Sequence, residues 1–468
     1  MESGRKLQYV VTTAVSLLTT AMGIFSAWRT PMISKIWANE TKIHIDDEDE
    51  YKILLMTPIG FYIGVVFAGF CCDGFGRRTT ILISAVIFEI GTVFAAFGIK
   101  VWMLCAMEFF WQFATGMLTV ASGIYLAEIA DPDIRGRLVV VTRVTFSLGN
   151  ILILSIGPKV SYEKMNYWLL LVAPLAFVAC YPIPESPYYH LRKNNEEAAR
   201  REFARIRENE GTETIQTQFN RLKSHTSKEL EDSKSFFKCL IKRRYTKAII
   251  ATFGMKLIYL LSGTVAIQSY YSTVTWESDV VLSVNDMFKI YMSIRIIIGL
   301  ASAVLVDKVG RRPLYMSSFI GSSICLFIMA IYFLSRDVLL LEKKILHPFA
   351  NVRFAALIIF IITSSFGVAS LTGLTTAEMY PLNVRTKGVV GVNLFAALGF
   401  AFGKMMKAIR GSGGDLGVFC AYGTGAAIGC VFTYFCLPET KDKSLNEIRE
   451  VLQGKSRSNG VEMTSREA

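Results

Sequence analysis

The sequence lacks the groups that most enzymes use for chemistry. It has only 4 histidines in 468 residues, and they are scattered along the chain. No set of histidine, cysteine and acidic residues has the spacing of a metal site. We find no phosphate-binding loop and no nucleophile in a motif with a base. The sequence therefore predicts no enzymatic activity, no cofactor and no metal ion.

Cysteine is present, but not where a disulfide framework would need it. All of the 9 cysteines except Cys239 lie in or at the ends of apolar stretches, and none lies in a loop that we expect on the outer side of a membrane. They are Cys71, Cys72, Cys105, Cys180, Cys239, Cys325, Cys420, Cys430 and Cys436. We therefore expect no disulfides.

Long apolar stretches dominate the sequence. Hydrophobic residues make up 52% of the chain, and its mean hydropathy is +0.41. A transmembrane helix needs about 20 mostly apolar residues. Stretches that approach this length are 7–28, 53–72, 80–98, 101–125, 138–156, 168–183, 248–270, 288–306, 314–334, 354–376, 389–406 and 416–437. The sequence therefore predicts an all-α membrane protein with twelve transmembrane helices.

The charges predict how these helices are oriented. The formal net charge is +12, and Lys and Arg concentrate in the central polar segment, the C-terminal tail and the short loops that hold Arg77, Arg135, Arg311 and Arg385. By the positive-inside rule these parts face the cytoplasm, as do both termini. We expect a lipid bilayer as partner and no nucleic acid. The first outer loop is acidic and carries the sequon that predicts glycosylation at Asn39.

A short charged stretch occurs twice, about half the chain apart. The copies are residues 73–78, Asp-Gly-Phe-Gly-Arg-Arg, and residues 307–312, Asp-Lys-Val-Gly-Arg-Arg. Each joins two apolar stretches, so the chain must turn back at once on one side of the bilayer. Glycine allows the tight turn, and the charged side chains can connect neighbouring helix ends.

Two further motifs repeat in the same order. After the fourth and tenth apolar stretches comes Ala-Glu with an arginine seven residues after the glutamate, at Glu128 and Arg135 and at Glu378 and Arg385. The sixth and twelfth stretches end in Pro-Glu, at residues 184–185 and 438–439. Three paired motifs in one order indicate an internal duplication. An alternative is that these charges only fix the topology, but it does not account for the repeated acids.

The duplication predicts the organisation of the chain. We expect a first six-helix bundle at 1–187, cytoplasmic linker helices at 188–247, a second six-helix bundle at 248–440 and a cytoplasmic tail at 441–468. In the linker, Leu191, Ala198, Phe203 and Ile206 lie roughly one helical face apart, which predicts an amphipathic helix ending near Gly211.

The repeated motifs resemble those of sugar porters of the major facilitator superfamily, including the insect trehalose- and glucose-transporter-like proteins. Residues 69–78 read Gly-x-x-x-Asp-x-x-Gly-Arg-Arg, and Pro-Glu-Ser-Pro and Pro-Glu-Thr-Lys close the two halves. The resemblance implies two bundles that rock about a central cavity, latched on the cytoplasmic side and located in the plasma membrane. The implied gate residues are Asp73, Arg77, Arg78, Glu128, Arg135, Glu185, Asp307, Arg311, Arg312, Glu378, Arg385 and Glu439.

The cavity positions depart from the family pattern. Sugar sites need side-chain amides, which both donate and accept hydrogen bonds. At the places of the family's seventh-span amides this chain has Lys256, Tyr259, Leu260 and Val265. The other implied cavity positions hold Glu108, Arg143, Arg295, Gly373 and Ala397.

Three of these residues are basic and lie well inside the expected spans. At about 1.5 Å per residue, Arg295 is about 18 Å from Asp307 along its helix, while Arg143 and Lys256 are about 12 Å from the cytoplasmic side. Such charges are costly unless they are paired or face water. They could form internal salt bridges with Glu108 and Glu89, they could bind an anion, or a neutral sugar could bind through other groups.

We expect an alternating-access carrier of a sugar of the hexose or trehalose class or of a related small solute. The alternatives are a carrier of a small organic anion and a non-transporting sensor built on a transporter fold. The first span has no acidic residue and Glu108 replaces the family's fourth-span arginine, so we expect facilitated diffusion without proton coupling. We expect a monomer.

Overall fold

The structure is a computed structural model of the whole chain. It describes residues 5–41, 43–131, 133–207, 212–231, 243–264, 284–339, 343–380 and 384–439, and these ranges contain helices and no strands. The expected all-α class is confirmed. Cys239, Val265 and the expected tail at 441–468 lie outside the described residues.

The first half of the chain forms one bundle. Its helices are α1 (Lys6–Ala27), α2 (Arg29–Trp37), α3 (Asp47–Gly74), α4 (Arg77–Phe97), α5 (Val101–Ile129), α6 (Arg135–Ile156), the short 3₁₀ helix η2 (Gly157–Lys159), α7 (Tyr162–Leu169) and α8 (Val172–Cys180). A buried aromatic cluster fills its core, where Phe25 stacks on Trp111 with ring centroids 4.8 Å apart. Trp28 contacts the same indole edge-on and donates a hydrogen bond to Asn166.

Three shorter helices follow. They are α9 (Pro187–Arg192), α10 (Glu196–Ile206) and α11 (Thr212–Glu231). Asn195 accepts a hydrogen bond from the backbone N–H of Ala198 and so caps α10. The buried face consists of Leu191, Ala199 and Phe203, packed on Phe219 of α11. The amphipathic helix is therefore present, but Ala199 rather than Ala198 is fully buried, and a turn divides the segment after Arg192.

The second half forms a second bundle. Its helices are α13 (Arg243–Leu261), α15 (Val284–Val309), α16 (Arg311–Asp337), α17 (Lys343–Phe366), α18 (Val368–Met379), α19 (Arg385–Phe395) and α20 (Leu398–Cys436). Helix α20 contains a kink at Gly414, whose φ is +63°. The expected eleventh and twelfth spans correspond to α19 with the first part of α20, and to the part of α20 after this kink.

Nine helices within the described ranges are long and apolar enough to span a membrane. The other three expected spans are divided or partly outside those ranges. The sixth is split into α7 and α8, the seventh is represented by α13, and the eleventh is interrupted at Ala396 and Ala397.

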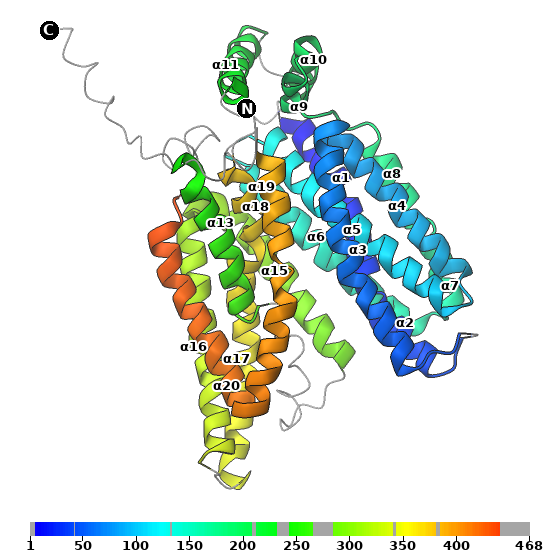
Figure 1. Ribbon diagram of the computed structural model, residues 1–468, viewed down its shortest axis with the longest axis vertical. Helices are drawn as coiled ribbons and strands as arrows, with labels where there is room; N and C mark the ends of the chain where they lie inside the picture. The colour runs from blue at the N-terminus through cyan, green and yellow to red at the C-terminus, as the bar shows by residue number, and fades with distance from the viewer. Residues whose placement is uncertain are drawn as a thin grey trace, which may run out of the picture.

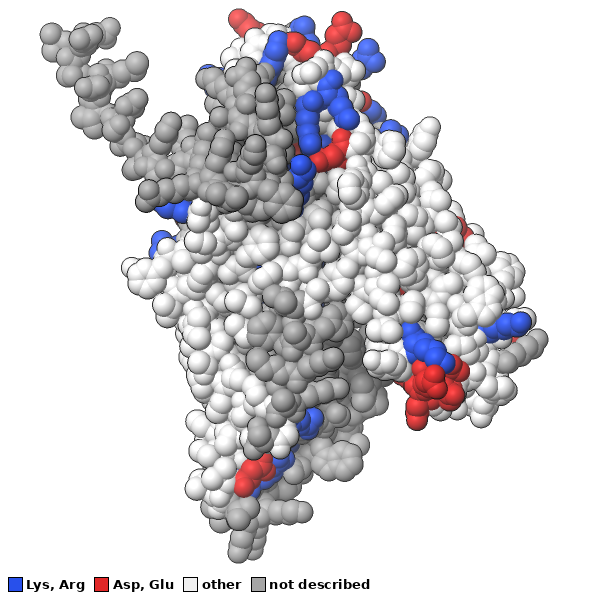
Figure 2. Space-filling model, in the orientation of Figure 1, with Lys and Arg blue, Asp and Glu red and all other residues white. Residues whose placement is uncertain are grey.

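The two bundles lie side by side, and α10 and α11 lie at one end of the molecule, which we call the linker end (Figure 1). Helices α2 and α7 lie at the opposite end, which we call the far end. Charged side chains on the visible face gather near the two ends, and an almost uncharged belt lies between them (Figure 2). Large apolar side chains on the outside of the bundles, such as Phe70, Leu175 and Phe435, are 73%, 68% and 77% exposed. Such a belt fits a lipid environment.

The repeated charged stretches form matching turns. Gly76 has φ +105° and Gly310 has φ +102°, a region that only glycine adopts readily. A Cβ atom would lie 2.3 Å from Glu185 Oε2 at Gly76 and 2.7 Å from Glu439 Oε2 at Gly310. Glycine is therefore needed at both turns for its conformation and for the space it leaves to a carboxylate.

Candidate functional site

The centre of the first-half motif cluster is the carboxylate of Glu128, at the linker end of α5. Arg77 Nε lies 3.0 Å from Glu128 Oε2, and Arg77 Nη2 donates to Glu128 Oε1 at 3.1 Å. Ser186 Oγ donates to Glu128 Oε2 at 2.5 Å. The Arg77 and Glu128 side chains are only 1% and 0% exposed. Three segments are thereby joined by one buried, charge-assisted group.

Glu185 binds the start of α4. It accepts hydrogen bonds from the backbone N–H groups of Arg77 at 2.9 Å, Arg78 at 3.1 Å and Ser186 at 2.8 Å. A carboxylate at this place satisfies the free N–H groups of a helix N-terminus. Burial raises the pKa of Glu185, and these N–H groups oppose that effect. Arg78 donates to the carbonyl of Tyr181 and lies over its ring.

The second half repeats this arrangement. Glu439 accepts from the N–H of Arg311 at 2.9 Å and of Arg312 at 3.0 Å. Arg311 Nη2 lies 3.3 Å from Glu378 Oε1, both side chains being 1% exposed. Arg312 donates to the carbonyl of Tyr434 and lies over its ring, as Arg78 does with Tyr181.

Polar contacts between described residues join the halves at the linker end. Arg385 Nη1 of α19 lies 3.3 Å from Glu128 Oε1 of α5. The backbone N–H of Arg137, in α6, donates to Asp307 Oδ2 of α15 at 3.0 Å. We call the twelve expected gate residues together with these contacts the linker-end latch. Arg135 is buried there and donates to the carbonyl of Ala130 at 3.5 Å.

The first aspartate of the repeat has a different partner from the second. Asp73 forms an ion pair with Arg192 of α9, and its other oxygen accepts from Arg192 Nη2 at 3.0 Å. Asp307 instead lies 3.4 Å from Arg311 within its own half. Asp73 therefore holds the linker, whereas Asp307 contacts the opposite bundle.

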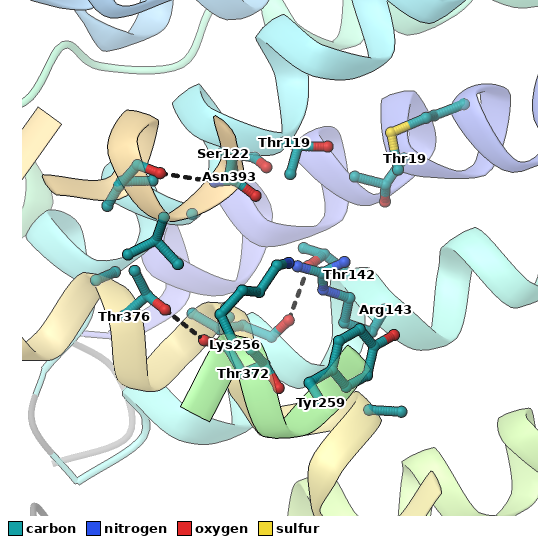
Figure 3. Close-up of a pocket in the computed structure, with 18 residues that line it drawn as sticks. Thr19, Thr119, Ser122, Thr142, Arg143, Lys256, Tyr259, Thr372, Thr376 and Asn393 are labelled. Atoms are coloured by element: carbon teal, nitrogen blue, oxygen red, sulfur yellow. Dashed lines mark hydrogen bonds between the residues drawn. The ribbon is translucent and has the colours of Figure 1, made fainter. Parts of the chain in front are cut away.

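A cavity of about 100 Å³ lies between the two halves. Its walls come from α1, α5 and α6 of the first half and from α13, α18 and α19 of the second. The described residues that line it are Thr19, Met22, Thr119, Ser122, Gly123, Val139, Thr142, Arg143, Lys256, Tyr259, Ala369, Thr372, Gly373, Thr376, Ala377, Val389, Val392 and Asn393. Figure 3 shows the polar side chains among them.

The structure brings four of the eight expected cavity residues into this lining, namely Arg143, Lys256, Tyr259 and Gly373. Arg143 lies against the backbone of α18, since a Cβ at Gly373 would be 2.7 Å from its Nη2. The other four lie elsewhere: Glu108, Leu260, Arg295 and Ala397 are outside the lining.

The expected acidic partners do not pair with these bases. Thr57 donates to Glu108 Oε1 at 2.7 Å and Gln112 does so at 3.0 Å, which keeps the Glu108 carboxylate inside the first bundle. Glu89 of α4 lines a groove together with Pro174 and Phe177 of α8. The salt bridge that we considered between Glu108 and the basic residues is therefore absent among the described contacts. Arg295 donates to the Tyr291 hydroxyl at 3.1 Å and lies over its ring.

With the latch and the cavity in place, comparison with known proteins decides the family. The sugar (and other) transporter family matches residues 19–452. The chain belongs to this family. Tret1, the facilitated trehalose transporter of Apis mellifera ligustica, is 24% identical over 451 residues, which cover 96% of this chain and 88% of that protein. Sugar transporter ERD6-like 17 of Arabidopsis thaliana is 26% identical over 397 residues, covering 84% of this chain and 81% of that protein.

A solved structure shares the fold. The proton:xylose symporter XylE bound to 6-bromo-6-deoxy-D-glucose matches with a TM-score of 0.77 at 18% identity, covering 96% of this chain and 100% of that one. The fold is that of the major facilitator superfamily, and the chain is a multi-pass membrane transporter. Because the family is one of transporters, its membership also agrees with the expectation that the protein is not an enzyme.

Sequence reasoning missed the hydroxyl-bearing part of this transporter's cavity. The lining residues it did not name include Thr19, Thr119, Ser122, Thr142, Thr372, Thr376 and Asn393. A weak signal was available, because Thr372 and Thr376 are four residues apart and so lie on one face of a helix. Serine and threonine are common inside membrane helices, however, where they bind the backbone of their own helix.

Asn39 lies outside both the latch and the cavity. It is exposed, follows α2 at the far end and has φ +58°. Its side-chain oxygen lies 3.2 Å from His44 Nδ1. This site is accessible from the side opposite to the linker.

Proposed function

We propose that this protein is a facilitative carrier that moves a small solute of the sugar class by alternating access. Its two halves would rock about the central cavity, so that the cavity faces each side of the membrane in turn. The observation that carries the proposal is that a cavity lies between the halves, while a buried ion pair and a backbone-to-carboxylate hydrogen bond between described residues join those halves at the linker end. The curated relatives named above are sugar transporters.

The proposal includes the topology. The linker end would face the cytoplasm, with both termini there, because basic residues concentrate in its loops. Asn39 would be on the outside and open to glycosylation. The halves would span 1–187 and 248–440, with linker helices at 188–247 and a tail at 441–468, and the protein would act as a monomer in the plasma membrane.

The latch would hold the outward-facing state. Breaking the contact between Arg385 and Glu128 and the contact between Arg137 and Asp307 would free the halves to separate at the linker end. No proton is required in this cycle, because the first span has no acidic residue and Glu108 is held by Thr57 and Gln112 inside one bundle.

Uptake by proteoliposomes tests the proposal. Vesicles that contain the purified protein should equilibrate a labelled hexose, hexose derivative or trehalose faster than protein-free vesicles, and should not concentrate it when a proton gradient is imposed. The carrier proposal fails if no member of a panel of neutral and charged sugars enters faster than in the protein-free control. The facilitative mechanism fails if accumulation follows the proton gradient and is lost in Glu108→Gln.

A further inference from the structure

The cavity carries two cations and no described anion. Arg143 enters from α6 of the first half, and Lys256 enters from α13 of the second. The described lining residues include no aspartate and no glutamate. Figure 3 shows the two basic side chains extending toward the same part of the cavity, and their charges interact with each other.

The hydrogen-bond partners of the two cations are missing among the described residues. The Lys256 ammonium lies 5.4 Å from the centre of the Tyr259 ring. The three hydrogen bonds within the drawn lining are Thr142 to Val139, Thr376 to Thr372 and Asn393 to Val389, and none of them involves either base (Figure 3).

This arrangement is costly for an empty cavity. A charged side chain in a membrane helix is normally paired or faces a water-filled pathway, and such residues usually mark where a substrate binds. Here two like charges approach each other from opposite halves. An anionic group placed between them would remove the repulsion and accept charge-assisted hydrogen bonds from both.

The hydroxyl groups in the lining favour accepting hydrogen bonds, whereas the two basic side chains donate them. The hydroxyl groups of Ser122, Thr142, Thr372 and Thr376 each donate to a backbone carbonyl of their own helix. Their hydrogens are therefore used, and their oxygens are left to accept hydrogen bonds. The cavity thus offers strong hydrogen-bond donors, the side chains of Arg143 and Lys256, and hydrogen-bond acceptors in the serine and threonine oxygens. This combination suits a molecule with an anionic end and several hydroxyl groups.

We propose that the transported solute is a sugar that carries a negative charge, bound with its carboxylate or phosphate between Arg143 and Lys256. The inference rests on the proposed carrier function and makes its substrate more specific. Arg143 and Lys256 reach the anion from different halves, so binding draws the halves together around the solute.

Three labelled probes that share one ring test this proposal: glucose, glucuronate and glucose 6-phosphate. Proteoliposomes should take up one of the two anionic sugars about tenfold faster than glucose, a ratio that two charge-assisted hydrogen bonds easily provide. Whether glucuronate or glucose 6-phosphate is taken up tells a carboxylate site from a phosphate site. Arg143→Gln and Lys256→Gln should each lower that uptake about tenfold or more, whereas Lys159→Gln, which removes an exposed charge at the end of η2, should leave it unchanged.

Melting temperature in detergent supplies a second measurement that does not need transport. Without solute, Arg143→Gln should melt at or above the wild-type temperature, because it removes a positive charge that has no ion pair among the described residues. The anionic sugar should raise the melting temperature of the wild type and not that of Arg143→Gln.

The outcomes separate the two proposals. If glucose is taken up, and neither anionic sugar is taken up or raises the melting temperature, the proposal of an anionic substrate is wrong and the carrier function stands. If none of the three probes is taken up but an anionic sugar raises the melting temperature, the carrier function is wrong and the binding site is supported. Equal stabilisation by inorganic phosphate, or a lower melting temperature of empty Arg143→Gln, overturns the sugar-anion site.

Discussion

The two halves of the molecule carry the same latch motifs, but they use the first aspartate of the motif differently. Asp73 is 20% exposed and pairs with Arg192 of the linker, while Asp307 is 6% exposed and accepts the N–H of Arg137 from the opposite half. By contrast, Glu185 and Glu439 bind the start of the following helix in the same way. The two halves therefore share the carboxylate contact at the helix start, whereas the partners of the two aspartates differ.

Glu128 should give the largest effect, because it is the point where the two halves share one buried carboxylate. Glu128→Gln removes the carboxylate that pairs with Arg77 and with Arg385, and breaking a buried pair in this way costs about 3–5 kcal/mol. We expect a large fall in melting temperature in detergent and a loss of most solute uptake by proteoliposomes.

An exposed glutamate provides the matched control for Glu128. Glu196 of α10 pairs with Lys223, and both side chains are about half exposed, at 53% and 45%. Exposed pairs contribute about 0–1 kcal/mol, so Glu196→Gln should change neither melting nor uptake appreciably. Equal behaviour of Glu128→Gln and Glu196→Gln would contradict the assignment of Glu128 to a contact between the halves.

The glycine turns test the part of the comparison in which the halves agree. Gly76→Ala and Gly310→Ala should each destabilise the protein by about 1–3 kcal/mol, the usual cost of a side chain in this backbone region. Gly76→Ala should be the more damaging, since its Cβ would lie 2.3 Å from a carboxylate oxygen against 2.7 Å at Gly310.

Gly74 is the control for both turns. It lies two residues before Gly76, and a Cβ there would meet no atom within 4 Å. Gly74→Ala should therefore melt as the wild type does. If all three alanine variants melted alike, the positive φ values at Gly76 and Gly310 would have no part in the latch.

Much of the architecture followed from the sequence because local rules determine it. Apolar length gave the spans, and the repeated Gly-Arg-Arg turns and Pro-Glu motifs indicated two related halves. Divided spans were harder: the break at Ala396 and Ala397 carries no proline or charge. The break at Leu170 and Leu171 precedes Pro174, whose ring clashes with the carbonyl four residues earlier, a signal that the expected sixth span did not use. Periodicity within one stretch cannot reveal where packing against a neighbour interrupts a helix.

The site was less predictable than the fold. Arg143 and Lys256 line the cavity, but the direction of a side chain depends on the rotation of the helix in the bundle, which the sequence does not specify. Arg295 and Glu108 were expected in the cavity and lie outside its lining. Which arginine meets Glu128 is also a matter of three dimensions, because Arg77 and Arg385 are far from it in sequence.

The two aspartates give the sharpest form of the comparison, and Asp73 should give the smallest effect of all. Asp307→Asn weakens the pair with Arg311 and the contact with the Arg137 N–H in a buried place, where losing a charged hydrogen bond costs about 1.5–3 kcal/mol. Asp73→Asn affects a more exposed pair, in which Asp73 is 20% and Arg192 25% exposed, and a pair near the surface contributes about 0–1 kcal/mol. Asp307→Asn should therefore lower the melting temperature more than Asp73→Asn does, and only Asp307→Asn should alter uptake. A double-mutant cycle of Asp73→Asn with Arg192→Gln should give a coupling of about 0.2–1 kcal/mol. If this coupling energy were as large as the loss of stability in Asp307→Asn, the contact between Asp73 and Arg192 would be as much a part of the latch as the contact between Asp307 and Arg137.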